Sequence, residues 1–406
     1  MKPPQIGPAF LVTAAFIGPG TVVTASLAGA NFGFALLWAL LFSIIATIIL
    51  QEMTARLGIV TQQGLGENIR EACKQPLLRT FAIALIVSAI AIGNSAYQSG
   101  NIAGASIGLT GAFKSLSDNT SQLQSIFSVL IGLVAFFLLI TGSYKVIEKA
   151  LIILVALMSA AFIVTFALTK PDFSALLSGL FTPSIPTGAT LTVIALIGTT
   201  VVPYNLFLHA ASVAKKWQNP KHLSQARKDL YFSIPLGGLI SMAILSTAAT
   251  AFFNQQITLN SAADIAPSLQ PLFGDSASLF LGLGLFSAGI SSAVTAPLAA
   301  AFALSGILNL TNDLHTKSFK AIWFVVLLLG VLGASLGYKP VNIIWFAQVA
   351  NGVLLPIVTL FLLWVMNTDK LGQFRNNKWQ NLLGALVVLV SLLLSGRSLM
   401  SAFGLL

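Results

Sequence analysis

Two short Gly/Pro motifs lie inside long apolar segments of the chain. Residues 17–21 read Ile-Gly-Pro-Gly-Thr, and residues 198–203 read Gly-Thr-Thr-Val-Val-Pro. Glycine weakens a helix and proline removes a backbone donor, so N–H and C=O groups near each motif are left free. In lipid these groups must find other partners. A packed kink explains one such motif, whereas a matched pair in two halves of a chain is typical of a transporter's substrate site.

We therefore expect the two motifs to line one central cavity. Hydroxyl and amide groups of Thr21, Thr199 and Asn205 would face this cavity, together with the freed carbonyls of Ile17 and Gly198. The predicted substrate-binding residues are Ile17, Gly18, Gly20, Thr21, Gly198, Thr199, Val202, Tyr204 and Asn205.

Other polar side chains also occur within apolar segments. Spacings of three and four residues place Asn94, Gln98 and Asn101, with Tyr97 between them, on one helix face. Such side chains either bond neighbouring helices or line a polar pathway. Both interpretations stay open, as they do for hydroxyls that can bond back to their own helix. The predicted pathway or gate residues are Asn94, Gln98, Asn101, His209, Gln348 and Asn351.

The composition excludes most classes of soluble protein. Charged residues make up 8% of the 406 residues, against about 25% in soluble domains, and hydrophobic residues make up 56%. The single cysteine excludes a disulfide framework and a cysteine zinc site. Because Asp, Glu, His and Cys are so scarce within the apolar segments, we do not expect an enzyme, and we expect no cofactor.

The apolar segments predict an all-α membrane protein with about eleven transmembrane helices, each near the roughly 20 residues that a bilayer needs. Short polar connections separate them, so we expect a single transporter domain over residues 1–406. The predicted spans are 8–30, 34–55, 78–109, 123–142, 147–168, 189–213, 232–253, 276–310, 319–337, 341–366 and 379–402.

The basic residues predict the orientation. Seventeen of the 21 Lys and Arg residues fall in alternate connections, and only Lys114, Lys170 and Lys339 fall in the others. The positive-inside rule places the seventeen in the cytoplasm, and we expect the protein to lie in a bacterial inner membrane. The N-terminus is then cytoplasmic. Near the cytoplasmic end of the second span, Glu52 and Arg56 have the spacing of a helix-end ion pair.

Four segments resemble the Nramp family of divalent metal transporters. Residues 7–38 are similar to its first span, including Gly-Pro-Gly-Thr at 18–21 and Ala-Gly-Ala-Asn-Phe-Gly at 28–33. Residues 202–209, Val-Pro-Tyr-Asn-Leu-Phe-Leu-His, resemble its sixth-span Met-Pro-His-Asn segment. Residues 288–295 and 348–352 are similar to its eighth and tenth spans.

This resemblance implies a LeuT-type fold with two inverted five-helix repeats and broken helices 1 and 6. The repeats would cover about 8–168 and 189–366, followed by an extra helix at about 379–402. It also implies alternating access and proton-coupled uptake of manganese or iron. His209 matches a histidine of the family's inner gate. In LeuT-type transporters a hydroxyl pair in the eighth span binds sodium, and Ser291 and Ser292 are the matching pair.

The chain departs from the family at the metal ligands. The first-span Asp and Asn are Gly18 and Thr21 here, and the sixth-span Met and His are Val202 and Tyr204. The third span also lacks the family's acidic residues. The family's divalent metal (manganese, iron or magnesium) is therefore one expected substrate, and a small anionic or zwitterionic solute is the alternative. The coupling ion is Na⁺ or H⁺, with sodium favoured by the neutral hydroxyls.

A secondary transporter is the expected function class. No Walker motif is present, which excludes ATP-driven pumping by this chain, and a channel would need a symmetric ring of filter groups. The expected partners are the lipid bilayer and a small ion or solute. We expect neither nucleic acid nor an obligatory protein partner, because the net charge of +10 follows the membrane topology.

Overall fold

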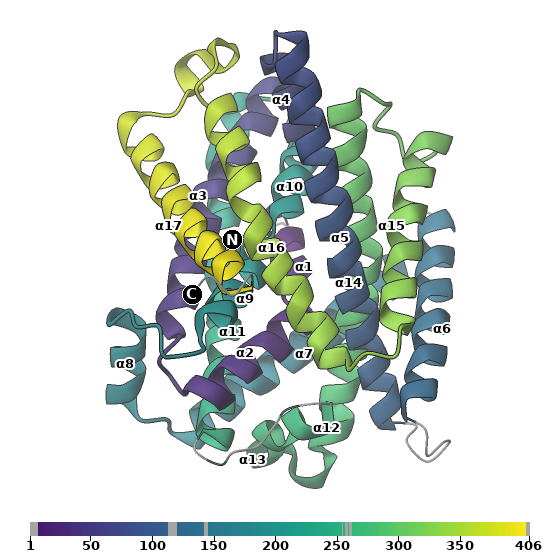
Figure 1. The fold of residues 1–406 in the computed structure, drawn as a ribbon, viewed down its shortest axis with the longest axis vertical. Helices are drawn as coiled ribbons and strands as arrows, with labels where there is room; N and C mark the ends of the chain where they lie inside the picture. The colour runs from purple at the N-terminus through teal and green to yellow at the C-terminus, as the bar shows by residue number, and fades with distance from the viewer. Residues whose placement is uncertain are drawn as a thin grey trace.

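The computed structural model describes residues 7–112, 120–141, 145–253 and 262–402, with residues 255 and 259, and every regular element in this part of the chain is a helix (Figure 1). The α-helices are α1 (Pro8–Phe16), α2 (Pro19–Phe32), α3 (Leu37–Thr61), α4 (Leu65–Ala72), α5 (Pro76–Ala112), α6 (Thr120–Thr141), α7 (Lys145–Thr169), α8 (Phe173–Phe181), α9 (Thr190–Thr200), α10 (Pro203–Lys216), α11 (Leu223–Phe252), α12 (Ala262–Ile265), α13 (Gln270–Phe273), α14 (Ala277–Leu308), α15 (Lys317–Ser335), α16 (Pro340–Val365) and α17 (Lys378–Ala402). Short 3-10 turns are η2 (Pro220–His222), η3 (Ala266–Leu269), η4 (Gly274–Ser276) and η5 (Asp369–Phe374).

The prediction of about eleven membrane spans is confirmed within the described residues. Ten helical segments are long and apolar enough to cross a membrane, with α9 and α10 counted as one, and the bent pair of α1 and α2 makes an eleventh. The largest differences from the predicted limits are at α3 and α11, which extend to Thr61 and begin at Leu223. Each extension contains charged residues, Arg56 in α3 and Arg227 and Lys228 in α11, at which an apolar pattern ends although the helix continues.

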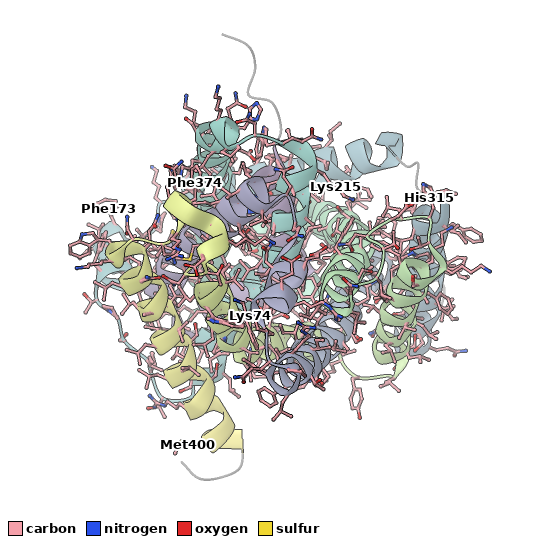
Figure 2. All side chains as sticks on the ribbon, turned by 90° about the horizontal axis from the view of Figure 1, so that it is seen from above. Lys74, Phe173, Lys215, His315, Phe374 and Met400 are labelled. Atoms are coloured by element: carbon pink, nitrogen blue, oxygen red, sulfur yellow. The ribbon has the colours of Figure 1, made fainter. Side chains whose placement is uncertain are left out.

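Basic residues gather at one end of the helix bundle. This end carries α4 and η5 and lies at the top of Figure 1, whereas α8, α12 and α13 lie at the opposite end. Figure 2 views the same end from above and labels Lys74 and Lys215 there. We call it the basic end. Lys2 and Lys114, which belong to the charge count, lie outside the described residues.

Three helices contain an interior proline: Pro235 in α11, Pro297 in α14 and Pro356 in α16. In α14 and α16 a neighbouring helix supplies a donor to the carbonyl that the proline leaves free. Pro297 in α14 offers no N–H to the carbonyl of Ala293, four residues earlier. The side-chain amide of Gln98, from α5, donates to that carbonyl at 2.9 Å. Pro356 in α16 likewise frees the carbonyl of Gly352, and the hydroxyl of Ser395, from α17, donates to it at 3.2 Å. Neighbouring helices thus complete the backbone hydrogen bonding that lipid cannot supply.

Candidate functional site

Both Gly/Pro motifs break a helix in the structure, as the sequence predicted. The chain leaves helical geometry at residues 17–18, between α1 and α2, where the two helices bend by 52°. The second break lies at residues 201–202, between α9 and α10. Pro19 and Pro203 each occupy the first turn of the following helix, where a missing N–H costs nothing.

The two breaks lie next to each other in space, although 178 residues separate their threonines. The hydroxyl oxygens of Thr21 and Thr199 are 2.9 Å apart, and both side chains are buried. Thr21 also donates to the carbonyl of Phe16, the last residue of α1. Since Thr21 has one hydroxyl proton and gives it to Phe16, Thr199 is the donor between the two threonines. The breaks therefore form one polar centre.

Glycines allow α14 and α16 to approach this centre. A Cβ atom on Gly18 would lie 3.1 Å from the hydroxyl oxygen of Ser292, in α14. A Cβ atom on Gly20 would lie 2.4 Å from the side-chain nitrogen of Gln348, in α16. One on Gly198 would lie 2.0 Å from the backbone oxygen of Gln348, which no real side chain permits. The missing side chains thus place polar groups of α14 and α16 against the two breaks.

Two tyrosines cover the centre from α5 and α10. The Tyr97 hydroxyl donates to the carbonyl of Ala15 at 3.1 Å; this carbonyl has no donor in a next turn, because α1 ends at Phe16. The Tyr97 and Tyr204 rings pack edge to face, with centroids 5.1 Å apart. The sequence placed Tyr97 on the polar face of α5 but assigned it no role, because its partner lies 82 residues away.

Several polar atoms around the centre are buried without a hydrogen-bonding partner in the protein. They are Oγ of Ser292, Oδ1 and Nδ2 of Asn205, Oε1 of Gln348 and Nδ2 of Asn351. Buried polar groups are nearly always paired in native proteins, so a cluster of unpaired ones points to water or a polar ligand. The described residues contain no group of three His, Cys, Asp or Glu side chains that could hold a metal. The centre offers neutral oxygens instead.

A narrow pocket leads from this centre toward the basic end. It lies between α5, α10 and α16, and measures about 10 Å³. Asn94, Tyr204 and Asn351 line its polar part. A space of this size holds about one water molecule, so this pocket is too narrow for a hydrated ion to pass. Its remaining lining is apolar: Ala89, Ile90, Gly93, Pro203, Leu354 and Val358.

The predicted gate residues fall into two groups. Asn94 and Gln98 donate to carbonyls of α14, at 3.2 and 2.9 Å, and so join helices. Asn94 also lines the pocket, and Asn101 is buried with its side-chain nitrogen unpaired. His209 lies farther toward the basic end, where its Nδ1 is 3.2 Å from the Thr54 hydroxyl. Their part in transport stays a prediction.

The remaining predicted residues also have definite positions. Val202 is buried in the second break. Ser292 faces Gly18, whereas the backbone carbonyl of its neighbour Ser291 accepts the Thr295 hydroxyl at 3.2 Å. The predicted ion pair of Glu52 with Arg56 is confirmed at 3.1 Å. Sequence reasoning missed the second partner of Glu52, Arg227 at 2.7 Å, because nothing local connects residues 175 positions apart.

Comparison with known proteins identifies the family. The family model described as natural resistance-associated macrophage protein-like, or Nramp, matches residues 9–401. The chain belongs to the Nramp family. It is 29% identical to a divalent metal cation transporter MntH of Yersinia pestis (strain Pestoides F), over 95% of this chain and 92% of that protein. It is 28% identical to an MntH of Pectobacterium carotovorum, over 95% of this chain and 91% of that protein.

Solved Nramp and LeuT-type transporters share the fold. A manganese transporter of Eremococcus coleocola superposes with a TM-score of 0.79 at 21% identity, covering 98% of this chain and 86% of that one. MhsT, solved with L-phenylalanine, superposes with a TM-score of 0.63 at 16% identity, covering 96% and 98%. The predicted LeuT-type fold is therefore confirmed, while the exact limits of its two repeats stay a prediction.

Proposed function

We propose that this chain is a secondary transporter that carries a divalent metal cation of the manganese, iron and magnesium class by alternating access. The observation that carries the proposal is the meeting of the two helix breaks around unpaired buried oxygens. Family membership over nearly the whole chain supports it, since relatives are named divalent metal cation transporters. The chain does no covalent chemistry in this proposal and is not an enzyme.

The donor set suits a hard cation that keeps part of its water shell. Hydroxyls of Thr21 and Thr199 and the amide oxygen of Asn205 are oxygen ligands without charge. Mg²⁺ dehydrates reluctantly and usually keeps several waters when bound. Manganese and iron also accept softer ligands, and the family's methionine thioether is absent here because Val202 replaces it. Within the metal class, magnesium is thus the preferred substrate.

The identity of the coupling ion is inferred from the same uncharged side chains. Proton symport needs a group that gains and loses a proton within the membrane, and the polar side chains gathered at the breaks are hydroxyls and amides. Ser292 presents an unpaired hydroxyl to the first break at Gly18. We assign coupling to sodium at this hydroxyl. Sodium-driven uptake at fixed membrane voltage should vanish in Ser292→Ala, whereas uptake driven by a pH gradient without sodium would contradict the assignment.

The basic end faces the cytoplasm in this proposal, and the protein lies in a bacterial inner membrane. The positive-inside rule and the gathering of Lys and Arg at α4 and α10 support this placement. The pocket next to Tyr204 and Asn351 is then the closed beginning of the path into the cell.

Uptake into proteoliposomes tests the substrate directly. The purified protein is supplied with magnesium, manganese or iron(II), and separately with amino acids and small carboxylates. We expect saturable uptake of magnesium. This uptake should be lost in Asn205→Leu, which replaces the amide side chain by an apolar one of nearly the same size. Uptake of a carboxylate or amino acid with no metal uptake would overturn the proposal. It would instead indicate that the N-terminus of α2, with Gly18 and Gly20, binds an anion.

A further inference from the structure

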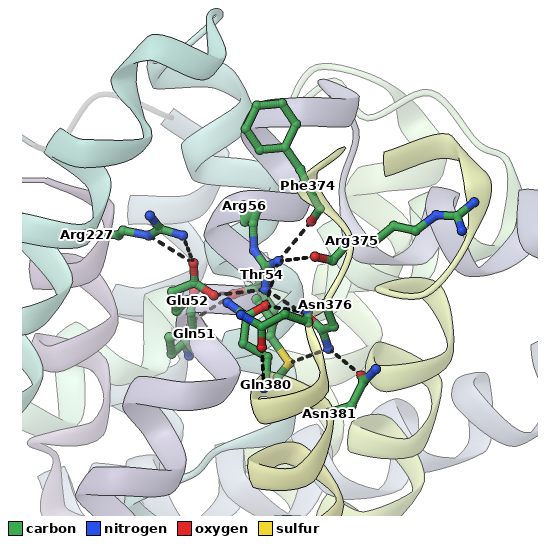
Figure 3. A network of polar contacts seen from close by, with 12 residues as sticks. Gln51, Glu52, Thr54, Arg56, Arg227, Phe374, Arg375, Asn376, Gln380 and Asn381 are labelled. Atoms are coloured by element: carbon green, nitrogen blue, oxygen red, sulfur yellow. Dashed lines mark hydrogen bonds and ion pairs between the residues drawn. The ribbon is translucent and has the colours of Figure 1, made fainter. Parts of the chain in front are cut away.

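The basic end of α3 carries a buried network of charged and amide groups (Figure 3). Glu52 accepts hydrogen bonds from the Arg227 guanidinium of α11, at 2.7 and 3.0 Å. It also pairs with Arg56, one helical turn along α3, at 3.1 Å. One carboxylate therefore serves two arginines. Because the Arg56 side chain is 3% exposed, its remaining N–H groups need other acceptors.

Arg56 finds these acceptors in the segment that joins α16 to α17 and in the first turn of α17. Its Nη1 donates to the carbonyls of Phe374 and Arg375, at 2.8 and 3.1 Å, and to the side-chain oxygen of Gln380 at 3.2 Å. Its Nη2 donates to the side-chain oxygen of Asn376 at 2.7 Å. Figure 3 shows the guanidinium between this segment and Glu52. Arg56 thus fastens α3 to the segment 374–380.

The acceptors of this contact are neutral. A guanidinium held by carbonyl and amide oxygens can exchange them for water once water reaches it, since hydrogen bonds to water replace those that are lost. Separating it from a buried carboxylate would leave an uncompensated charge, which is far more costly. The bonds from Arg56 to the segment 374–380 are therefore the part of the network that can open and close, while Glu52 keeps Arg227.

Helix α3 is also joined closely to α10, the half-helix that begins at the second break. A Cβ atom on Gly58 would lie 2.3 Å from the backbone oxygen of Ala210, so the two backbones are in contact. The hydroxyl of Thr54 is 3.2 Å from Nδ1 of His209. Any movement of α10 away from the narrow pocket therefore takes α3 with it. Such a movement must break the bonds between Arg56 and the segment 374–380.

We propose that Arg56 is a positioning residue of the transport cycle. By joining α3 and α10 to the segment 374–380, it holds α10 against α5 and α16 and keeps the site closed at the basic end. Release of these four bonds accompanies opening toward that end. The inference rests on the proposed transport function, but the closure itself can be measured without any substrate.

A cysteine in the closed pocket reports the opening. Ala89 lines the pocket and is 6% exposed, so Ala89→Cys is introduced into a Cys73→Ser background. The measured quantity is the labelling rate by a membrane-impermeant thiol reagent, added at the basic end of the reconstituted protein. Adding Arg56→Gln should raise this rate about tenfold, as expected for the loss of hydrogen bonds from a charged group. Arg56→Lys, which retains the charge and part of the bonding, should raise it less.

Two further variants separate the proposal from general loosening. Asn376→Ala/Gln380→Ala removes two acceptors and keeps the Glu52–Arg56 pair, so it should also raise the labelling rate. If Arg56→Gln does not fold, this variant tests whether Arg56 keeps the pocket closed. Arg227→Gln removes only the link from α3 to α11 and should label at the parent rate. Parent-like labelling in both the Arg56 and the Asn376/Gln380 variants would overturn the proposal. An equal rise in Arg227→Gln would overturn it as well.

Discussion

Gly18 lies in the first helix break, next to side chains of α14 and α5. A Cβ atom there would touch the Ser292 hydroxyl at 3.1 Å and the Tyr97 hydroxyl at 3.9 Å. Both contacts are with the ends of side chains, which can shift by a few tenths of an ångström. The position therefore tolerates a methyl group but has no room for a branched side chain while a substrate is bound.

Gly18→Val should abolish transport and leave the protein folded, because its methyl groups fill the space between Ser292 and Tyr97. Gly18→Ala is the matched control and should retain part of the activity. The measurement is substrate uptake, with size-exclusion elution and thermal unfolding as the test of folding. Unchanged uptake by the valine variant would show that Gly18 serves packing alone.

Glu67 in α4 is a partly buried carboxylate outside the membrane spans. It is bonded to Asn312, and burial raises its pKa above the usual value. A raised pKa means that the folded state disfavours the charged form, so the group destabilises the protein at neutral pH and ceases to do so as the pH falls below its usual pKa. Glutamine can still accept the bond from Asn312 without bearing a charge.

Glu67→Gln should therefore raise the midpoint of thermal unfolding at pH 7.5. The difference from the parent should shrink as the pH is lowered toward 4, where the parent carboxyl is protonated in both states. Unfolding curves of both proteins across this range provide the test. A variant less stable than the parent at pH 7.5 would indicate that the charge of Glu67 contributes a favourable interaction.

At the scale of the elements, the sequence predicted the two helix breaks well because Gly and Pro act locally. It could not predict which side chains would donate hydrogen bonds to the free carbonyls. Tyr97 bonds Ala15, and Gln98 bonds Ala293, 195 residues away. Only the packing of α5 against α1 and α14 brings these groups together, and no single segment encodes it. For the same reason the sequence did not predict Arg227 as a partner of Glu52.

The contact of α9 with α16 depends on Gly198. A Cβ atom there would lie 2.0 Å from the backbone oxygen of Gln348 and 2.6 Å from the backbone nitrogen of Gly352, and backbone atoms cannot rotate away. Gly198→Ala should cost about 1–3 kcal/mol of stability, as overpacking usually does. Gly396→Ala in α17, with nothing within 4 Å, is the control and should be neutral or slightly stabilising. Equal thermal stability of the two variants would exclude the tight contact.

At the scale of the whole molecule, hydropathy alone located nearly every span, because lipid requires long apolar helices. It missed α4 and α8, short helices of eight and nine residues at the two ends of the bundle. Their length lies below what an apolar segment search detects. The sequence predicted the two motifs of the polar centre. It did not show that Ser292 and Gln348 lie against them, because only the packing of α14 and α16 brings these residues there.

Orientation in the membrane can be tested by labelling from each side. In a Cys73→Ser background, Lys221→Cys in η2 and Lys170→Cys after α7 should react with an impermeant thiol reagent from opposite sides of intact cells. Lys170→Cys should react from outside, because the proposed orientation places the basic end in the cytoplasm. Reaction of both cysteines from outside would refute the orientation.

The bond between Gln98 and the carbonyl of Ala293 makes two distant positions mutationally dependent on each other. Gln98→Leu alone leaves a bare carbonyl in the membrane interior, because Pro297 has no N–H to give. Once Pro297→Ala restores the helical bond, the glutamine is dispensable, so the double variant should unfold at a higher temperature than Gln98→Leu. The order in which the two substitutions arise then matters: a lineage can lose the proline first and the glutamine afterwards, but the reverse order passes through a poorly folded intermediate. A non-additive double-mutant cycle would reveal this epistasis, and strict additivity would exclude it.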